Sequence, residues 1–339
     1  MVTSMAYRLA RDESIPQGAL RILQEELSEA VSRLRDPGDV DAGVHGARKA
    51  IKRARALLRL VRAGLGPQFA RENHALRDAA RLLAQRRDAA VAAATFEQLV
   101  PEPPPNLVPL RDALLAARDA VAGAAAADPL AAAAADLELA HRRTERWPTF
   151  TRGWPVVEAG LKTSYGGGRR AMREAFRDPS PDAFHEWRKR VKDLWYHTLL
   201  LQGVWKTVQL AWAGALEDLS DALGEDHDLE VLRLAVAALP DTDPEARREL
   251  LARADDRSSE LRTAARTLGQ RIYAEPPRRY LARMRRYWEA WRSDERRAAE
   301  ARRVADAAPP RPEAPPSEVV PPPCPPEPAP ADMPQEPDT

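Results

Sequence analysis

Cysteine, aromatic residues and long apolar runs are all scarce in this chain of 339 residues. The single cysteine, Cys324, lies in a proline-rich C-terminal segment, so an internal disulfide and a cysteine-based metal site are both excluded. No stretch of about 18 uninterrupted apolar residues occurs, which argues against a membrane span. Because Met1 to Arg11 also lacks the apolar run of a signal peptide, we expect a cytoplasmic protein without a membrane partner.

The composition favours helices. Alanine, leucine, arginine and glutamate dominate, while isoleucine and threonine are sparse. Apolar residues recur at spacings of three and four, and prolines such as Pro16, Pro67 and Pro181 stand where a first helical turn would begin. No convincing strand alternation appears. We predict an all-α protein of about nine or ten helices, most of about 20 to 30 residues, packed as antiparallel bundles.

The C-terminal segment, residues 306–339, differs from the rest. It holds 14 prolines and seven acidic residues against Arg311 alone. Such a segment has almost nothing apolar to bury, so we predict a disordered tail, either a solvated extension or a docking site for another protein. The net charge of +1 therefore conceals a folded part, residues 1–305, of about +7.

An internal repeat relates the two halves of the folded part. Val44–Lys52 aligns with Phe184–Lys192 at an offset of 140 residues, and the match continues without a gap for about 50 residues. A duplication predicts two antiparallel four-helix-type bundles with pseudo-twofold symmetry. Repeat 1 would span about 14–150 and repeat 2 about 151–305.

The helix predicted from Val44 to Arg62 separates an apolar seam from a cationic stripe. The seam consists of Val44, Ala47, Ile51, Ala54, Leu58 and Val61. The stripe falls within about 120° of the helix and consists of His45, Arg48, Lys49, Lys52, Arg55 and Arg59. No acid interrupts this region, so its charges repel one another unless an anion neutralises them. At about 21 Å, the stripe suits an extended polyanion better than one phosphate.

The second half repeats the beginning of this stripe with His185, Arg188, Lys189 and Lys192, beside a seam of Phe184, Trp187, Val191 and Leu194. Trp195, Tyr196 and Leu199 then replace Arg55, Ala56 and Arg59, which predicts a shorter track with a more buried end. Upstream, Gly166 to Gly168 precede Arg169, Arg170 and Arg173. We expect these cations beside the track, with the glycines letting phosphate approach backbone N–H groups near a helix start.

Histidines stand at the head of both stripes. His227, in a Glu-Asp-His-Asp run, occupies the position that carries Arg87 in the first half, and an Arg-to-His exchange suits phosphate contact. Because no tight ligand spacing occurs, we predict no metal site and no cofactor. A protonated histidine beside phosphate would have a raised pKa, so binding would weaken as pH rises. We expect structural roles for His74, His141 and His197.

These motifs, two tandem His-x-x-Arg-Lys-x-x-Lys stretches and the Leu223–Leu229 segment, resemble those of the CHAD family, the "conserved histidine α-helical domain". The similarity covers about residues 5–295. It implies two helical bundles, binding of inorganic polyphosphate in a basic cleft and, for some members, association with polyphosphate granules in bacteria. By position it implies binding roles for His45, Arg48, Lys49, Lys52, His185, Arg188, Lys189, Lys192 and His227. Arg87 departs from the family pattern, since a histidine of the His227 type is missing there.

We therefore predict a non-catalytic polyphosphate-binding protein, granule-associated or a scaffold. Many family members are fused to a triphosphatase, but its Glu-x-Glu-x-Lys signature is missing here. Nucleic-acid binding is an alternative, although the stripes have few aromatics for base stacking and no recognised reading motif. A metal-dependent polyphosphate phosphohydrolase is another, with Glu225, Asp226 and Asp228 as its candidate carboxylates. A helical scaffold with an incidental basic face is the last alternative.

Overall fold

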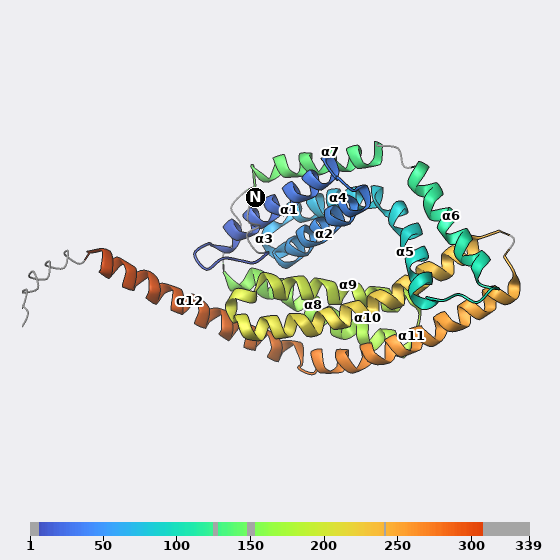
Figure 1. Cartoon of the computed structure of the whole chain (residues 1–339). Coiled ribbons are helices and arrows are strands. Elements are labelled where there is room, and N and C mark those ends of the chain that lie inside the picture. Colours follow the sequence, from blue (N-terminus) through green and yellow to red (C-terminus); the bar gives the residue numbers. More distant parts are fainter. Residues whose placement is uncertain (1–6, 125–127, 148–152, 241, 308–339) are drawn as a thin grey trace, which may run out of the picture. The chain divides into compact units, whose positions relative to one another are not determined.

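A computed structural model describes residues 7–124, 128–147, 153–240 and 242–307 (Figure 1). Every regular element in these ranges is a helix, which confirms the all-α prediction. Twelve α-helices and one short 3₁₀ helix, Gln202–Val204, occur in the described part of the chain. The α-helices range from 4 to 33 residues. They are more numerous than predicted because the helical run of the first half is interrupted at Val61 and again at Leu83. None of the described helices has the length and hydrophobicity that crossing a bilayer requires.

The first half builds a bundle of four helices: α1 (Ile15–Arg35), α2 (Val40–Leu60), α4 (Pro67–Leu82) and α7 (Asp128–Thr144), with α3 (Arg62–Leu65) as a short link. Asp39 caps α2 by accepting a hydrogen bond from the Ala42 N–H, which satisfies a donor that has no partner within the helix. The predicted seam of α2 is buried in this bundle at every position. The cations of α2 lie on the adjoining face, beside this buried seam.

The second half packs α8 (Trp154–Arg177), α9 (Pro181–Leu200), α10 (Lys206–Ala238) and α11 (Pro244–Ile272). The last helix, α12 (Pro277–Ala307), belongs to the same compact unit as far as Arg296. The predicted seam of α9 is buried, and Ser180 caps the helix by accepting from the Ala183 N–H. Since α12 reaches Ala307, the predicted tail begins two residues inside a helix, and residues 308–339 lie outside the described ranges.

The helix order of the second half follows that of the first. Helix α8 begins 139 residues after α1, and α9 begins 141 residues after α2. The offset of 140 is therefore kept at the level of whole helices. Common descent of the two halves stays a prediction.

Two helices of the first half leave their bundle. Helices α5 (Ala84–Leu99) and α6 (Val108–Ala124) pack against α10 and α11, where a separate apolar cluster forms. Its buried members include Phe96, Leu107, Leu110, Leu232 and Leu250. The break at Leu83 lets α5 diverge from α4, whereas α10 continues through the corresponding region as one helix of 33 residues. The two bundles therefore share an element, because α5 follows α4 of the first bundle in the chain and packs against α10 of the second.

The two halves also touch directly through α2, α8 and α9. His197 of α9 lies between the Ser164 hydroxyl of α8 and the Ala56 carbonyl of α2, at 3.0 and 2.9 Å. Gly160 of α8 lies so close to the Leu60 backbone of α2 that a Cβ atom there would overlap it. These buried contacts join the halves along one line and confirm the structural role expected for His197.

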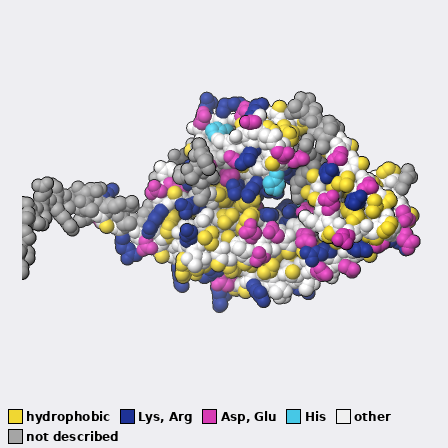
Figure 2. Space-filling view, in the orientation of Figure 1, with side chains coloured by type: hydrophobic (Ala, Val, Ile, Leu, Met, Phe, Trp, Pro, Cys, Tyr) yellow, Lys and Arg dark blue, Asp and Glu magenta, His cyan; other side chains and the backbone are white. Residues whose placement is uncertain are grey.

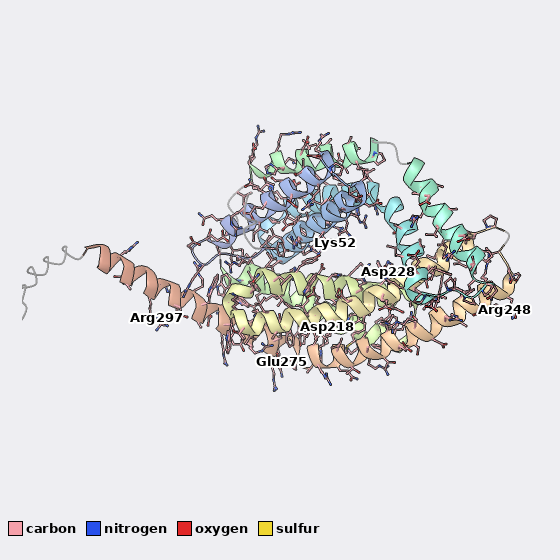
Figure 3. All side chains as sticks on the ribbon, in the orientation of Figure 1. Lys52, Asp218, Asp228, Arg248, Glu275 and Arg297 are labelled. Atoms are coloured by element: carbon pink, nitrogen blue, oxygen red, sulfur yellow. The ribbon has the colours of Figure 1, made fainter. Side chains whose placement is uncertain are left out.

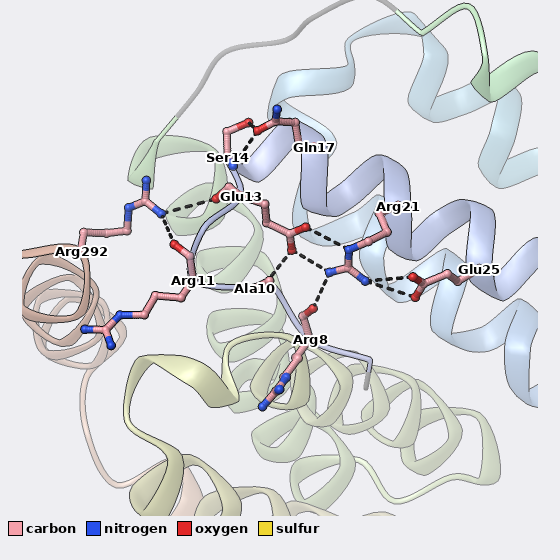
Figure 4. A network of polar contacts seen from close by, with 9 residues as sticks. All are labelled: Arg8, Ala10, Arg11, Glu13, Ser14, Gln17, Arg21, Glu25 and Arg292. Atoms are coloured by element: carbon pink, nitrogen blue, oxygen red, sulfur yellow. Dashed lines mark hydrogen bonds and ion pairs between the residues drawn. The ribbon is translucent and has the colours of Figure 1, made fainter. Parts of the chain in front are cut away.

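The segment before α1 ties α1 to α12 (Figure 4). Arg21 pairs with Glu13 at 2.7 Å and with Glu25 at 3.2 Å. Arg292 of α12 donates to the backbone carbonyls of Arg11 and Glu13 at 3.1 and 3.4 Å. Arg21 and Arg292 therefore stabilise the fold, because they donate to carboxylates and carbonyls of the protein itself.

Candidate functional site

A cleft of about 580 Å³ opens between α2, α5, α9 and α10. Its cations are Arg48, Lys49 and Lys52 from α2, and Arg188 and Lys192 from α9, and His45 of α2 also lines it. Two stretches that are 140 positions apart in the sequence thus face one space. Figure 3 labels Lys52 and Asp228 beside this space, and Figure 2 shows dark blue side chains and a histidine around the hollow.

The packing of α2 explains why its cations reach the cleft. Because the seam is buried in the first bundle, the stripe on the adjoining face points toward the second half. Lys49 and Lys52 are exposed, while Arg48 is half-buried and donates to the Ala80 carbonyl of α4 at 3.1 Å. That hydrogen bond fixes the Arg48 guanidinium at the edge of the cleft.

Burial and cationic neighbours lower the pKa values of two cations of α2 and α9. Burial, followed by the charge of Arg188, lowers the pKa of Lys192, although Asp221, Glu217 and Asp228 act in the opposite direction. Burial, followed by Arg59, lowers the pKa of Arg55 to about 10. A lowered pKa in a cation means that its charged form is under-compensated. An anion in the cleft would compensate the buried charge of Lys192 and reduce its repulsion by Arg188.

The rest of the lining is apolar and acidic. The apolar part consists of Val44, Ala90, Val91, Ala94, Trp195 and Tyr196. The Lys192 ammonium lies 5.0 Å from the centroid of the Trp195 ring, within the range of a cation–π contact. Asp41 and Asp228 are the two carboxylates against five Lys and Arg side chains among these lining residues, so the cleft is positive. The sequence interpretation missed Asp41 and the α5 residues that line the cleft, Ala90, Val91 and Ala94, although it named Arg87 of the same helix.

Two cations of the stripe predicted on α2 interact with other residues of the protein instead of lining the cleft. Arg59 pairs with the buried Asp193 of α9 at 2.6 Å, and Arg55 donates to the Asn73 side chain at 3.2 Å. Neither lines the cleft, so the track on α2 is shorter than predicted. The reason is the approach of α9, which brings Asp193 against the far end of α2.

Lys189 also lies outside the cleft. It pairs with Glu186 at 2.5 Å on the exposed side of α9. Residues 188 and 192 are separated by about 40° around a helix, whereas residue 189 is about 100° from residue 188. The orientation that turns Arg188 and Lys192 into the cleft therefore turns Lys189 out of it.

Two of the three histidines of the second half, His185 and His227, lie together. The rings of His185 and His227 are 4.4 Å apart and line a small hollow with Phe184, Asp226, Glu230 and Arg262, among others. Burial, followed by the charges of Lys189 and Arg188, lowers the pKa of His185. His185 Nδ1 is buried and has no hydrogen-bond partner among the described residues. His45 lines the main cleft, and the side chain of Arg87 lies outside the described ones.

The arginine cluster of α8 is not beside the cleft, and the expectation that its glycines lie near a helix start was wrong. Helix α8 runs unbroken from Trp154 to Arg177, so Gly166 to Gly168 lie in its middle. A Cβ at Gly168 would overlap the Tyr273 hydroxyl, which shows that this glycine allows close helix packing. Gly167 contacts Arg190, about 160° around α9 from Arg188. The cations of α8 are therefore on the far side of α9, namely Arg169, Arg170 and Arg173.

The candidate carboxylates of a hydrolase do not converge. Glu225 pairs with Arg257 at 2.7 Å and Asp226 with Arg262 at 3.0 Å, both toward α11. Asp228 instead lines the cleft. Within the described ranges, no three His, Cys, Asp or Glu side chains form a group that could hold a metal ion.

Comparisons with known proteins agree with this architecture. The family model of the CHAD domain matches residues 18–237. The crystal structure of the CHAD domain from the plant Ricinus communis is 19% identical, with a TM-score of 0.55 over 81% of this chain and 96% of that one. PptA from Streptomyces chartreusis is 15% identical, with a TM-score of 0.50 over 78% of this chain and 100% of that one. At these identities the likeness shows the fold alone. A search of the curated proteins found no match.

Proposed function

This chain belongs to the CHAD domain family, and from that premise we propose that it binds inorganic polyphosphate in the cleft between α2, α5, α9 and α10. It does so without catalysis, as a granule-associated or scaffold protein of the cytoplasm. The observation that carries the proposal is the convergence of cations from α2 and α9 on one space. Polyphosphate carries a negative charge on each phosphate and has no nucleobase for a protein to read. It therefore matches a lining in which cations outnumber carboxylates by five to two.

The chemistry of the cations suits phosphate oxygens. The planar guanidinium groups of Arg48 and Arg188 can each donate two parallel hydrogen bonds, whereas Lys49, Lys52 and Lys192 supply point charges. Because the pKa of Lys192 is lowered by burial and by Arg188, phosphate nearby would restore the favourable environment of the ammonium. Binding is therefore driven by neutralisation along the cleft and should weaken steeply as salt concentration rises, by analogy with counterion release.

The arrangement of carboxylates supports binding rather than hydrolysis. Phosphoryl transfer with a metal ion usually needs carboxylates that hold the cation against the phosphate. Glu225 and Asp226 are instead engaged by Arg257 and Arg262. Incubation of the protein with polyphosphate and magnesium or manganese should release no phosphate above the level of a buffer control.

A nucleic acid is the competing ligand, because Trp195 and Tyr196 line the cleft and could stack on bases. Polyphosphate and single-stranded RNA should be compared at equal phosphate concentration. We expect polyphosphate to displace RNA, since most of the polar lining consists of cations rather than base-reading groups. Displacement of polyphosphate by RNA would favour the competing function.

The decisive experiment compares three lysines by retention on immobilised polyphosphate. Lys52→Gln and Lys192→Gln should each weaken binding about tenfold or more, since a hydrogen bond to a charged group contributes about 1.5–3 kcal/mol. Lys189→Gln is the matched control, because Lys189 is on the same helix as Lys192 but outside the cleft. It should change affinity by less than about twofold. Equal losses in all three variants, with unchanged helical content, would contradict a cleft site.

A further inference from the structure

A second basic surface lies on the other side of α9 from the cleft. Its cations come from α8, from the end of α11 and from the start of α12: Lys162, Arg169, Arg170, Arg173, Arg271, Arg278 and Arg279. We call this set the α8–α12 basic face. None of its members lines the cleft. Figure 2 shows Lys and Arg side chains along the lower edge of the compact unit, where α11 and α12 run in Figure 1.

Contacts between α8 and the α11–α12 turn bring these cations together. The Tyr165 hydroxyl donates to the Glu275 carbonyl at 3.0 Å, and Arg169 donates to the Tyr273 carbonyl at 3.0 Å. Pro277, the first residue of α12, lies beside Gly166. The exposed arginines that follow Pro277 are therefore held against the exposed face of α8.

The face has excess positive charge. Within the described ranges, Lys162, Arg170, Arg173 and the three arginines beside the α11–α12 turn form no ion pair with a carboxylate. Three of the acids nearby have cationic partners outside the face. Glu174 pairs with Arg177, and Glu275 pairs with Arg283 at 2.9 Å. Glu186 is shared by Lys189 and Arg190. The like charges of such a surface repel one another, and a bound anion would reduce this repulsion.

The two basic regions are too far apart for a short anion to reach both. Helix α9 separates them, since Gly167 of α8 packs on Arg190 and Ser164 packs on His197, on the face of α9 opposite Arg188. Each helix is about 10 Å across, so the face is on the order of 20 Å from the cleft. A tripolyphosphate can occupy one region at a time, whereas separate chains, or distant segments of a long chain, can occupy both.

We propose that the α8–α12 basic face is a second polyphosphate-binding surface, and that one molecule of this protein thereby bridges two polyphosphate segments. The inference rests on the function proposed for the cleft and adds valency to it. A protein with two such surfaces cross-links long chains, because binding of a second segment gains from the high local concentration of chain around the first. That property would give a granule scaffold its cohesion.

A sandwich assay tests the proposal with the full chain. Protein is bound to immobilised polyphosphate, washed, and offered a fluorescent long-chain polyphosphate. Wild type should capture the labelled chain. The face variant Arg271→Glu/Arg278→Glu/Arg279→Glu changes exposed residues that do not line the cleft. It should stay on the immobilised chain but capture at least about fivefold less labelled chain. The control Arg118→Glu/Arg248→Glu/Arg253→Glu makes the same charge change at a partly exposed position of α6 and two exposed positions of α11, and should capture like wild type.

The outcomes separate this inference from the proposed function. Capture by the face variant at the wild-type level would overturn the second surface while leaving the cleft intact. Equal losses in the face variant and its control would also overturn it, because the effect would then be one of net charge alone. Failure of wild type to bind immobilised polyphosphate would instead refute the function proposed for the cleft. Circular dichroism of each variant checks that the helices remain.

Discussion

The imidazole rings of His185 and His227 lie 4.4 Å apart, one on α9 and the other on α10. His185 is one helical turn from Arg188, and His227 is next to Asp228, so both histidines adjoin residues that line the cleft. The charged groups around them are Asp182, Glu186, Arg188 and Lys189 on α9, Asp226 and Glu230 on α10, and Arg262 on α11. The pair is thus placed where the protonation state of a ring can respond to an anion.

We predict that polyphosphate binding strengthens as pH falls from about 7 to about 5.5. Burial, then Lys189 and Arg188, hold the pKa of His185 below its usual 6.5, so the ring is neutral at pH 7. An anion nearby raises that pKa, and linkage then requires proton uptake on binding. Calorimetry in buffers of different ionisation enthalpy would measure the uptake.

The double variant His185→Gln/His227→Gln isolates this effect from the ionisation of the ligand itself. It should bind with a flatter pH profile and take up fewer protons than wild type, with similar affinity at pH 8. His141→Gln, on α7 and away from the cleft, is the control. An unchanged pH profile in the double variant would show that the histidine pair takes no part in binding.

A second prediction separates a binding cation from a structural one on the same helix. Arg59→Gln should leave polyphosphate affinity nearly unchanged but lower the free energy of unfolding by about 2 kcal/mol or more, because Asp193 would remain buried without its partner. Lys52→Gln should do the reverse, since Lys52 is exposed and lines the cleft. Urea denaturation and a binding titration on both variants give the comparison. Loss of affinity in Arg59→Gln as large as in Lys52→Gln would restore the longer track predicted from the sequence.

Helical periodicity made the seams and part of the cleft predictable. Val44 and Phe184 begin apolar stripes that are buried as expected, and a stripe fixes the direction of the cations on the adjoining face. The repeat then suggested that Lys52 and Lys192 would be used together, and both line one cleft. These predictions needed only the geometry of single helices.

What the sequence could not supply was the rotation and crossing of one helix relative to another. Lys189 differs from Lys192 only in its angle around α9, and that angle matters only once the position of α2 is known. Val91 lines the cleft because α5 diverges from α4 at Leu83. No proline or glycine near Leu83 marks this helix break in the sequence. The cluster containing Arg170 is adjacent to α9 in sequence, yet α8 packs on the face of α9 opposite the cleft.

A third prediction concerns the contact of α8 with α2. A Cβ at Gly160 would overlap backbone atoms of Leu60, which cannot move aside as a flexible side chain can. Gly160→Ala should therefore lower the free energy of unfolding by about 1–3 kcal/mol. Gly214→Ala is the matched control, because Gly214 lies inside α10 and a Cβ there meets nothing within 4 Å. That change should raise stability by about 0.5–1 kcal/mol. Equal effects of the two substitutions in urea denaturation would contradict close packing at this crossing.

The last prediction follows from His197, which joins α9 to both α8 and α2. A carbonyl can only accept, so Nε2–H donates to Ala56 and the neutral ring accepts from the Ser164 hydroxyl at Nδ1. Burial lowers the pKa of His197 to about 4, whereas an unfolded chain takes up this proton near 6.5. The stabilisation is therefore complete above about pH 6.5 and is lost as pH falls toward 4, by about 3 kcal/mol in total.

The variant His197→Gln tests this assignment. It keeps a donor and an acceptor but has no proton to gain, so its stability should fall less than that of wild type between pH 7 and pH 4.5. Since Glu26 also has a shifted pKa, about 7, only the difference between variant and wild type reports on His197. His74→Gln, at an exposed position of α4, should follow wild type. If His197→Gln loses stability with pH as steeply as wild type does, another group governs the acid response.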